Sequence, residues 1–207
     1  MYQATVDYKK YGQRPYILAA PIAFIIVLMA MVLGALLDPS YNYFGNHNIS
    51  DLGIADRNIL TSILFNAACC IGGVLISAFG FGKYHFEKED WNEKAGVFFF
   101  IGGIGLIFVG VFTADLPYPH NFFAGVFATG MVLGIVLSTL QDIKEGDKFI
   151  LYSSIIILAY LIIEWPFFSN ALSESMSILC ATVWFLIQIN KYKKQGKLEK
   201  GYVAPSE

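Results

Sequence analysis

Charged residues are scarce in this sequence, and arginine is almost absent. Asp, Glu, Lys and Arg make up 14% of the 207 residues, whereas hydrophobic residues make up 56%. A soluble domain carries about 25% charged residues, so a soluble fold is excluded. The net charge is only -2 and arginine occurs twice. Without a basic surface interleaved with aromatic residues, the sequence also excludes nucleic acid as a partner.

Cysteine and histidine are equally rare, with three of each. Cys69, Cys70 and Cys180 lie inside apolar runs, so the sequence predicts neither a disulfide framework nor a zinc knuckle. The histidines form no HxxxH or HExxH pair, which excludes the usual zinc motifs. We predict no cofactor. A divalent metal stays open only through the carboxylates and the imidazole discussed below.

Long apolar runs, in contrast, are abundant, and there are six of them. Each approaches the about 20 residues that a helix needs to cross the roughly 30 Å hydrocarbon core of a bilayer. In lipid a helix satisfies its own backbone hydrogen bonds, so we predict an all-α, polytopic membrane protein, one domain (1–207) with a six-transmembrane-helix bundle. The predicted spans are 16–37, 59–81, 95–113, 121–140, 149–168 and 175–190, followed by a basic tail, 191–207.

The positive residues predict which side of the membrane each connection faces. Of the 14 lysines and arginines, all except Arg57 lie in the two tails or in the second and fourth connections. By the positive-inside rule, both termini are cytoplasmic and the first, third and fifth connections are outside. We therefore predict a multi-pass protein of the cell membrane. Its expected partner is membrane lipid, and a homo-oligomer stays open.

Small residues recur on the third and fourth predicted spans. Gly103 and Gly110 lie on the third, and Gly130 and Gly134 form a GxxxG pair on the fourth. In lipid, helices associate through van der Waals contact, so glycine allows two backbones to approach closely. We predict that these two helices are central. The alternative is that glycine is simply frequent in membrane helices.

Polar residues gather in the outer connections, and one carboxylate lies within a span. Glu164 is sixteen residues beyond Lys148, thus about 24 Å along the helix and a few Å beneath the outer boundary. An ionisable group at that depth marks a functional or structural polar site. We predict an outer mouth that consists of Ser50, Asp51, Gly53, Asp115, His120, Glu164 and Trp165.

Two interpretations of the mouth stay open. In the first, His120 is a base and Asp51 or Glu164 is a metal ligand or an orienting carboxylate, for work on a lipid ester or amide. In the second, Ser50 and Asp51 cap a turn, Asp115 ends its helix in water and His120 lies at the wet interface. No G-x-S-x-G signature supports a serine nucleophile. Few polar residues lie at mid-depth, which argues against transport.

The string Asn48-Ile49-Ser50-Asp51-Leu52-Gly53, then Gly110-Val111-Phe112 and a helix led by His120, resembles DUF family 998. These are small prokaryotic membrane proteins of unknown function. More distantly, the chain is similar to the damage-regulated autophagy modulators and to proteins that remodel the lipids of glycosylphosphatidylinositol anchors. The resemblance implies a six-helix membrane fold and work on or near outer-leaflet lipids. It marks Ser50, Asp51, Gly53 and His120 as motif positions, and the sequence departs from the pattern at Thr113-Ala114-Asp115.

The leading hypothesis is therefore a membrane protein that recognises a lipid or lipid-linked group at its outer mouth. One alternative is a membrane-embedded lipid hydrolase or acyl-remodelling enzyme. Another is a structural or regulatory protein that binds other helices through its glycine faces. A shared site requires Asp51, His120 and Glu164 to surround a common cavity.

Overall fold

The computed structural model describes residues 15–45, 47–146, 148–167 and 170–194, with the backbone alone over 164–167. These residues form six α-helices and one short 3-10 helix, with no strand among them, which confirms the all-helical prediction. The elements are α1 (Tyr16–Leu37), η2 (Ile49–Gly53), α2 (Ile59–Phe86), α3 (Asp90–Val111), α4 (Pro117–Glu145), α5 (Lys148–Phe167) and α6 (Ala171–Lys194).

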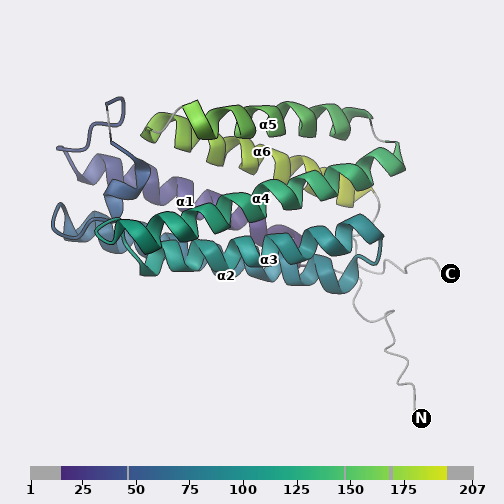
Figure 1. Cartoon of the computed structure of the whole chain (residues 1–207), viewed down its shortest axis with the longest axis horizontal. Helices are drawn as coiled ribbons and strands as arrows, with labels where there is room; N and C mark the ends of the chain where they lie inside the picture. The colour runs from purple at the N-terminus through teal and green to yellow at the C-terminus, as the bar shows by residue number, and fades with distance from the viewer. Residues whose placement is uncertain (1–14, 46, 147, 168–169, 195–207) are drawn as a thin grey trace, which may run out of the picture.

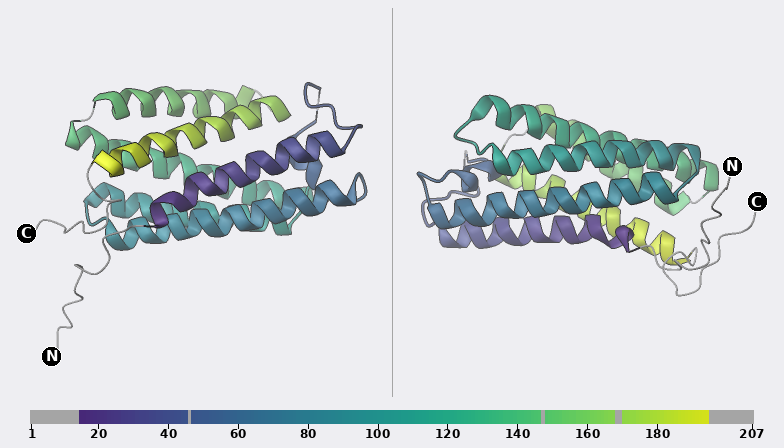
Figure 2. Two further views of the ribbon diagram at one scale, coloured as in Figure 1. Left: turned by 180° about the vertical axis from the view of Figure 1, so that it is seen from behind. Right: turned by 90° about the horizontal axis from the view of Figure 1, so that it is seen from below.

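The helices run along one elongated bundle (Figure 1). α5 and α6 lie on one side, α2 and α3 on the opposite side, and α1 and α4 between them. The view from behind shows α6 beside α1 (Figure 2), where the rings of Phe24 and Phe185 are 5.4 Å apart. We call the end that carries the connection 38–58 the loop end. The opposite end, where α1 begins and α6 ends, is the terminal end.

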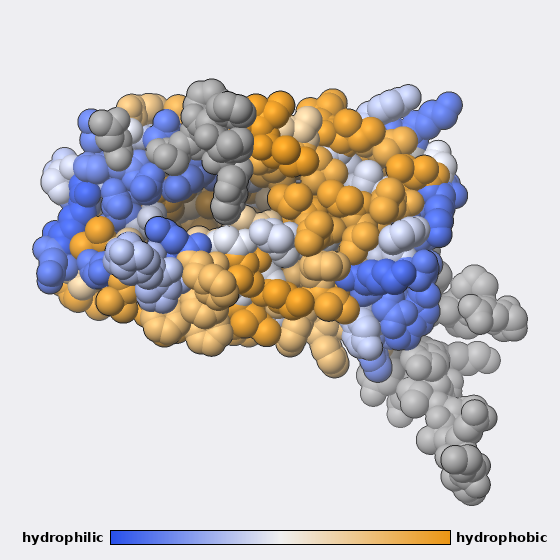
Figure 3. Space-filling model, viewed as in Figure 1, coloured by the Kyte–Doolittle hydropathy of each residue, from blue (hydrophilic) through white to orange (hydrophobic). Residues whose placement is uncertain are grey.

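Five helices are long and apolar enough to cross a membrane, namely α1, α2, α3, α4 and α6. In α5 the apolar stretch found over the described residues, Lys148–Ile163, is shorter. Apolar residues cover the middle of the surface in Figure 3, whereas polar residues gather at its two ends. This distribution matches a bilayer core between two aqueous faces, and the chain is a multi-pass membrane protein.

Most helices extend beyond the predicted spans, because capping rather than hydropathy determines where a helix ends. α2 begins where the Asn58 side chain accepts hydrogen bonds from the N–H groups of Leu60 and Thr61, at 3.1 and 3.3 Å. It continues to Phe86, beyond the predicted limit at 81. α4 ends at Glu145 and is capped by Gly146, whose φ of 78° is the left-handed conformation that glycine adopts without strain. The apolar runs therefore mark the part of each helix that suits lipid.

Glycines bring α2, α3 and α4 into close contact. A Cβ atom built on Gly73 would lie 2.6 Å from the backbone oxygen of Gly103, and one on Gly130 would lie 2.7 Å from the Cα of Gly102. Gly110 faces the backbone oxygen of Asn66 in the same way. Gly134 instead faces the ring of Phe99, at 2.6 Å. α3 is thus held between α2 and α4 by contacts that no larger residue would allow.

An aromatic cluster fills the centre of the bundle in the half nearer the terminal end. Phe99 and Phe185 lie within 6 Å of one another, and each contacts Phe79 and Trp184. The indole of Trp184 donates a hydrogen bond of 2.9 Å to the Ser154 hydroxyl, which fixes α6 against α5. These large rings occupy one half of the core. The other half contains smaller side chains and a cavity.

Candidate functional site

A cavity of about 490 Å³ lies between the aromatic cluster and the loop end. Residues of α1, α2, α3, α4 and α6 line it, together with Leu161 of α5 and, from the loop, Asn48 and the η2 residues Ile49 and Ser50. Its volume falls in the range of small-molecule sites, about 300–1,000 Å³. Along α4 the lining runs from His120 to Ile135, which is about 22 Å at the helical rise. The space-filling view shows the surface hollowed toward the loop end (Figure 3).

The polar lining residues are confined to the loop end of this cavity. We call them the mouth, and they are Asn48, Ser50, His120, Asn121, Glu174 and Ser177. The remaining lining residues are apolar, such as Val27, Phe65 and Met131. No Lys or Arg is found among the described residues that line the cavity. The site therefore combines a deep apolar interior with one polar opening, whose described residues include no Lys or Arg.

His120 reaches the mouth because the tight turn between α3 and α4 fixes its ring. The side chain is only 6% exposed, and its Nδ1 lies 2.7 Å from the backbone oxygen of Phe112, where α3 ends. A carbonyl oxygen can only accept, so Nδ1 carries the proton. In the neutral ring, Nε2 is then an acceptor, and it has no hydrogen-bond partner within the described part of the chain. The imidazole thus presents an acceptor in a defined orientation.

Asp51 and Gly53 shape the loop above the mouth. The Asp51 carboxylate accepts a hydrogen bond of 3.1 Å from the N–H of Asn48 and so caps η2. Gly53 lies against α2, where Ser62 and Asn66 donate to its backbone oxygen at 2.8 and 3.0 Å. A Cβ at Gly53 would lie 2.6 Å from the Asn66 side-chain oxygen. The I-S-D-L-G string therefore sets how the loop turns and how closely it packs.

Two hydrogen bonds dock this loop on the start of α6. The N–H of Ile49 donates to the Glu174 carboxylate at 2.7 Å, and the N–H of Ala171 donates to the oxygen of His47 at 2.7 Å. The Tyr41 hydroxyl also donates to the backbone oxygen of Asn48 at 3.0 Å. These bonds hold Asn48 and Glu174 together at the mouth, although 125 residues separate Ile49 from Glu174.

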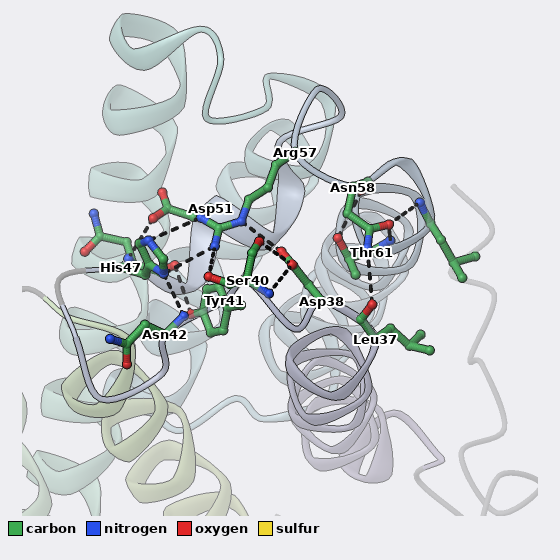
Figure 4. A network of polar contacts seen from close by, with 12 residues as sticks. Leu37, Asp38, Ser40, Tyr41, Asn42, His47, Asp51, Arg57, Asn58 and Thr61 are labelled. Carbon is green, nitrogen blue, oxygen red and sulfur yellow. Dashed lines mark hydrogen bonds and ion pairs between the residues drawn. The ribbon is translucent and has the colours of Figure 1, made fainter.

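A second polar cluster stabilises the loop beside the mouth (Figure 4). Arg57 donates from Nε to Asp38 at 2.8 Å and from Nη2 to the Ser40 oxygen at 2.9 Å. Its guanidinium lies 5.4 Å from the centre of the Tyr41 ring, and the Asn42 N–H donates to Nδ1 of His47 at 2.8 Å. Arg57 is thus engaged within the loop, and it does not line the cavity.

Asp38 makes this loop sensitive to acid. Burial tends to raise the pKa of its carboxyl, but hydrogen bonds from Ser40 and Arg57 outweigh burial and hold the pKa below its ordinary value. Its stabilising contribution is therefore complete above the unfolded pKa of about 3.9 and is lost as the pH falls through the lower folded pKa.

Replacing Arg57 with glutamine should lower the free energy of unfolding by about 1–3 kcal/mol. The reason is that the Asp38 carboxylate, only 3% exposed, would lose its charged hydrogen-bond donor.

Thermal unfolding in detergent between pH 3 and pH 7 measures both the effect of Arg57→Gln and the acid-induced loss of stability. Asp38→Asn is the variant that removes the titrating group. The acid-induced loss of stability should be smaller in Asp38→Asn than in the unsubstituted protein. An identical pH profile for both would contradict the role given to Asp38.

The structure brings some of the predicted site residues together. Ser50 and His120 line the same cavity, whereas Asp51 caps η2 and does not line it. Asp115 is exposed and accepts a hydrogen bond of 3.0 Å from the Thr113 hydroxyl, away from the cavity. The side chains of Glu164 and Trp165 lie outside the described residues. Asp51, His120 and Glu164 were predicted to surround one cavity. His120 lines it and Asp51 does not, whereas the Glu164 side chain is outside the described residues.

The proposed metal ligands, Asp51, His120 and Glu164, give no assembled site in the part of the chain that the structure describes. There, no three His, Cys, Asp or Glu side chains come together as ligands. Because the Glu164 side chain is not among them, the metal stays a prediction.

Sequence reasoning missed Glu174 and Asn48 as mouth residues. Glu174 lies in the first turn of α6, one residue before the predicted span at 175. An acid is common at that position, since it interacts favourably with the helix dipole, and so it gave no specific signal. Asn48 belongs to the motif string, but its place at the cavity depends on how the loop folds back.

Comparison with known proteins gives one match. The family model described as "Protein of unknown function (DUF998)" matches residues 18–188, a segment that runs from α1 into α6 and includes the I-S-D-L-G string and His120. No curated protein and no solved structure matches the chain. The more distant similarity to autophagy modulators and anchor-remodelling proteins therefore stays a prediction. Since the matched segment covers well over half of the sequence, the chain belongs to the DUF998 family.

Proposed function

We propose that this protein binds a lipid or lipid-linked group, with the polar head at the mouth and an apolar chain in the cavity. The observation that carries the proposal is the cavity itself, whose polar groups occur at one end only. An amphiphile has the same division. The apolar lining of α4 runs from Ala124 to Ile135, about 17 Å, which is close to the roughly 15 Å of hydrocarbon in one leaflet.

We also propose that all six helices cross the cell membrane and that both termini are cytoplasmic. α5 is 20 residues long and lies along the bundle beside α6, which supports a sixth span. Among the described residues, Arg57 is the only basic residue at the loop end. The described lysines of the terminal end are Lys83, Lys88, Lys94, Lys144, Lys148, Lys191, Lys193 and Lys194. The positive-inside rule then directs the mouth to the outer leaflet.

Gly125 offers a direct test, because it lines the cavity and a Cβ built on it meets no atom within 4 Å. Phenylalanine at this position should occupy the cavity without displacing the backbone. Native mass spectrometry of gently extracted protein should show a bound amphiphile on the unsubstituted chain. We expect Gly125→Phe to reduce its occupancy at least tenfold, or about 1.4 kcal/mol.

The matched control is Thr129→Phe, one turn further along α4 on an exposed face. It adds the same side chain to the same helix and should retain the amphiphile. Equal occupancy in the two variants, or an unsubstituted protein that carries no amphiphile, would contradict the proposal.

A second candidate function is lipid hydrolysis or acyl remodelling. It is favoured by His120, which lines the cavity with Ser50 and is held by Phe112 in the tautomer that a base requires. A nucleophile and its base need to be within hydrogen-bond reach, however, and the described side chains show no bond between Ser50 and His120. Binding is therefore the function that the geometry supports best.

The third alternative, helix binding through glycine faces, is less well supported. Gly103, Gly110, Gly130 and Gly134 all contact neighbouring helices of the same chain. These surfaces are therefore already buried within the bundle and are not presented to a partner.

A further inference from the structure

The hydrogen-bonding groups of the mouth indicate the chemistry of the head group. We infer that the bound amphiphile has a head that donates hydrogen bonds and carries no negative charge, as a long-chain amine or a monoacylated polyol does. This inference rests on the proposed function. It follows from Asn48, His120 and Glu174, which belong to three separate elements and meet at the loop end of the cavity.

Asn48 supplies a buried acceptor that the protein leaves unsatisfied. Its backbone N–H donates to Asp51 and its backbone oxygen accepts from Tyr41, so the residue is fixed in place. Its side-chain oxygen is shielded from solvent. It faces the Asp51 N–H in the capping box of η2, but that N–H donates to the Asn48 backbone oxygen at 3.2 Å, so the side-chain oxygen has no hydrogen bond in the described structure. A buried acceptor without a partner destabilises the folded protein, and a donor on the ligand would remove that cost. Because Asn48 lines the cavity, the head group can provide that donor.

His120 of α4 adds a second hydrogen-bond acceptor at the mouth. Its Nδ1–H is used by the Phe112 carbonyl, so the neutral ring can only accept at Nε2. The ring faces the cavity. A hydroxyl or ammonium group that enters the mouth therefore finds an acceptor on α4 as well as on the loop.

The charge of the described mouth residues disfavours an anionic head. Glu174 contributes a carboxylate, and no Lys or Arg is present among the described lining residues. Arg57, the basic residue of the loop end, donates to Asp38 and Ser40 instead. Proteins recognise phosphate and carboxylate groups with Arg, Lys or clustered N–H donors. A phosphate or fatty-acid head would here meet the like charge of Glu174, and none of the described lining residues supplies a cation for it.

Competition among probes of equal chain length tests the inference. Hexadecylamine, monopalmitoylglycerol and palmitate are added in equal amounts to delipidated full-length protein at neutral pH, and bound species are counted by native mass spectrometry. We expect the amine and the glycerol ester each to exceed palmitate at least tenfold. Glu174→Gln, which keeps an acceptor for the Ile49 N–H, should lower the amine relative to the glycerol ester about tenfold.

Gly125→Phe provides the background for each probe, and Gly125→Leu repeats the measurement with a smaller group if the first variant folds poorly. Palmitate bound as well as the amine, and lost in Gly125→Phe, would overturn the head-group inference while leaving lipid binding intact. A Glu174→Gln protein with unchanged preference for the amine would also overturn it. No probe above the Gly125→Phe background would overturn the proposed function and this inference together.

Discussion

Replacing Asp142 with alanine should lower the free energy of unfolding by about 3–5 kcal/mol. Asp142 is 1% exposed and joins α4 to α6 near the terminal end. It accepts a hydrogen bond of 3.0 Å from Gln188 and pairs with Lys191, whose ammonium group also lies 2.8 Å from Glu145. Lys191 is 7% exposed. Without Asp142, the buried ammonium group would lose its fully buried partner and keep only Glu145, which is 27% exposed and offsets less of the lost hydration.

Titration with a denaturing detergent, followed by circular dichroism, measures this loss. Asp90→Ala is the matched control, because Asp90 pairs with Lys94 at 3.1 Å but is 63% exposed, and it should lose less than about 1 kcal/mol. Replacing both partners, Asp142→Leu with Lys191→Met, should restore most of the stability, since neither charge is then left buried. Equal losses in Asp142→Ala and Asp90→Ala would show that the ion pair is not buried in the folded protein.

This ion pair also determines how the cavity is bounded. α4 and α6 are joined near the terminal end by Asp142 and Lys191, and both helices line the cavity toward the loop end. Between these points the aromatic cluster fills the half of the core that is nearer the terminal end. At the loop end, the bonds of Ile49 and Ala171 to their partners hold the loop against α6 beside the mouth. The cavity thus exists because α4 and α6 are held in place near their ends, while the side chains between them do not fill the space.

The helices themselves could be predicted from the sequence, since apolar runs of membrane length have few other structures available in lipid. Both ends of α1 and the start of α2 agree with the predicted spans. Other ends could not be predicted: α4 continues to Glu145, beyond the predicted limit at 140, because Gly146 caps it through a backbone conformation that hydropathy does not measure. The family was also predicted correctly, from the order of the I-S-D-L-G string and His120.

The candidate site was only partly predictable. His120 and Ser50 were expected at a common mouth, and they line one cavity. The capping geometry of Asp51 is local, because the carboxylate lies three residues from the N–H that it accepts. Glu174, in contrast, reaches the mouth only through the packing of α6 against a loop 125 residues earlier. Sequence periodicity does not contain that information.

The surroundings of two glycines on α4 also depend on how the helices pack, and substitutions there should have very different effects on stability. Gly125 and Gly130 lie on one helix, five residues apart. The GxxxG pair predicts close packing at Gly130, whereas no sequence pattern indicates that Gly125 lines a cavity. A Cβ on Gly130 would lie 2.7 and 2.8 Å from the Cα and nitrogen of Gly102. Because those atoms are backbone, α3 and α4 must separate to admit a side chain. Gly130→Leu should therefore lower the free energy of unfolding by about 3 kcal/mol, the upper end for overpacked cores.

Gly125→Leu should not lower the free energy of unfolding. Leucine is about 1 kcal/mol better than glycine in a helix, and here its side chain enters open space, so stability should be unchanged or raised by up to that amount. The same detergent titration, applied to both variants, measures the difference of about 3–4 kcal/mol between one substitution at two positions of α4. Similar losses at both positions would mean that the cavity is filled in the folded protein. Similar tolerance at both would mean that α3 and α4 do not pack through Gly102 and Gly130.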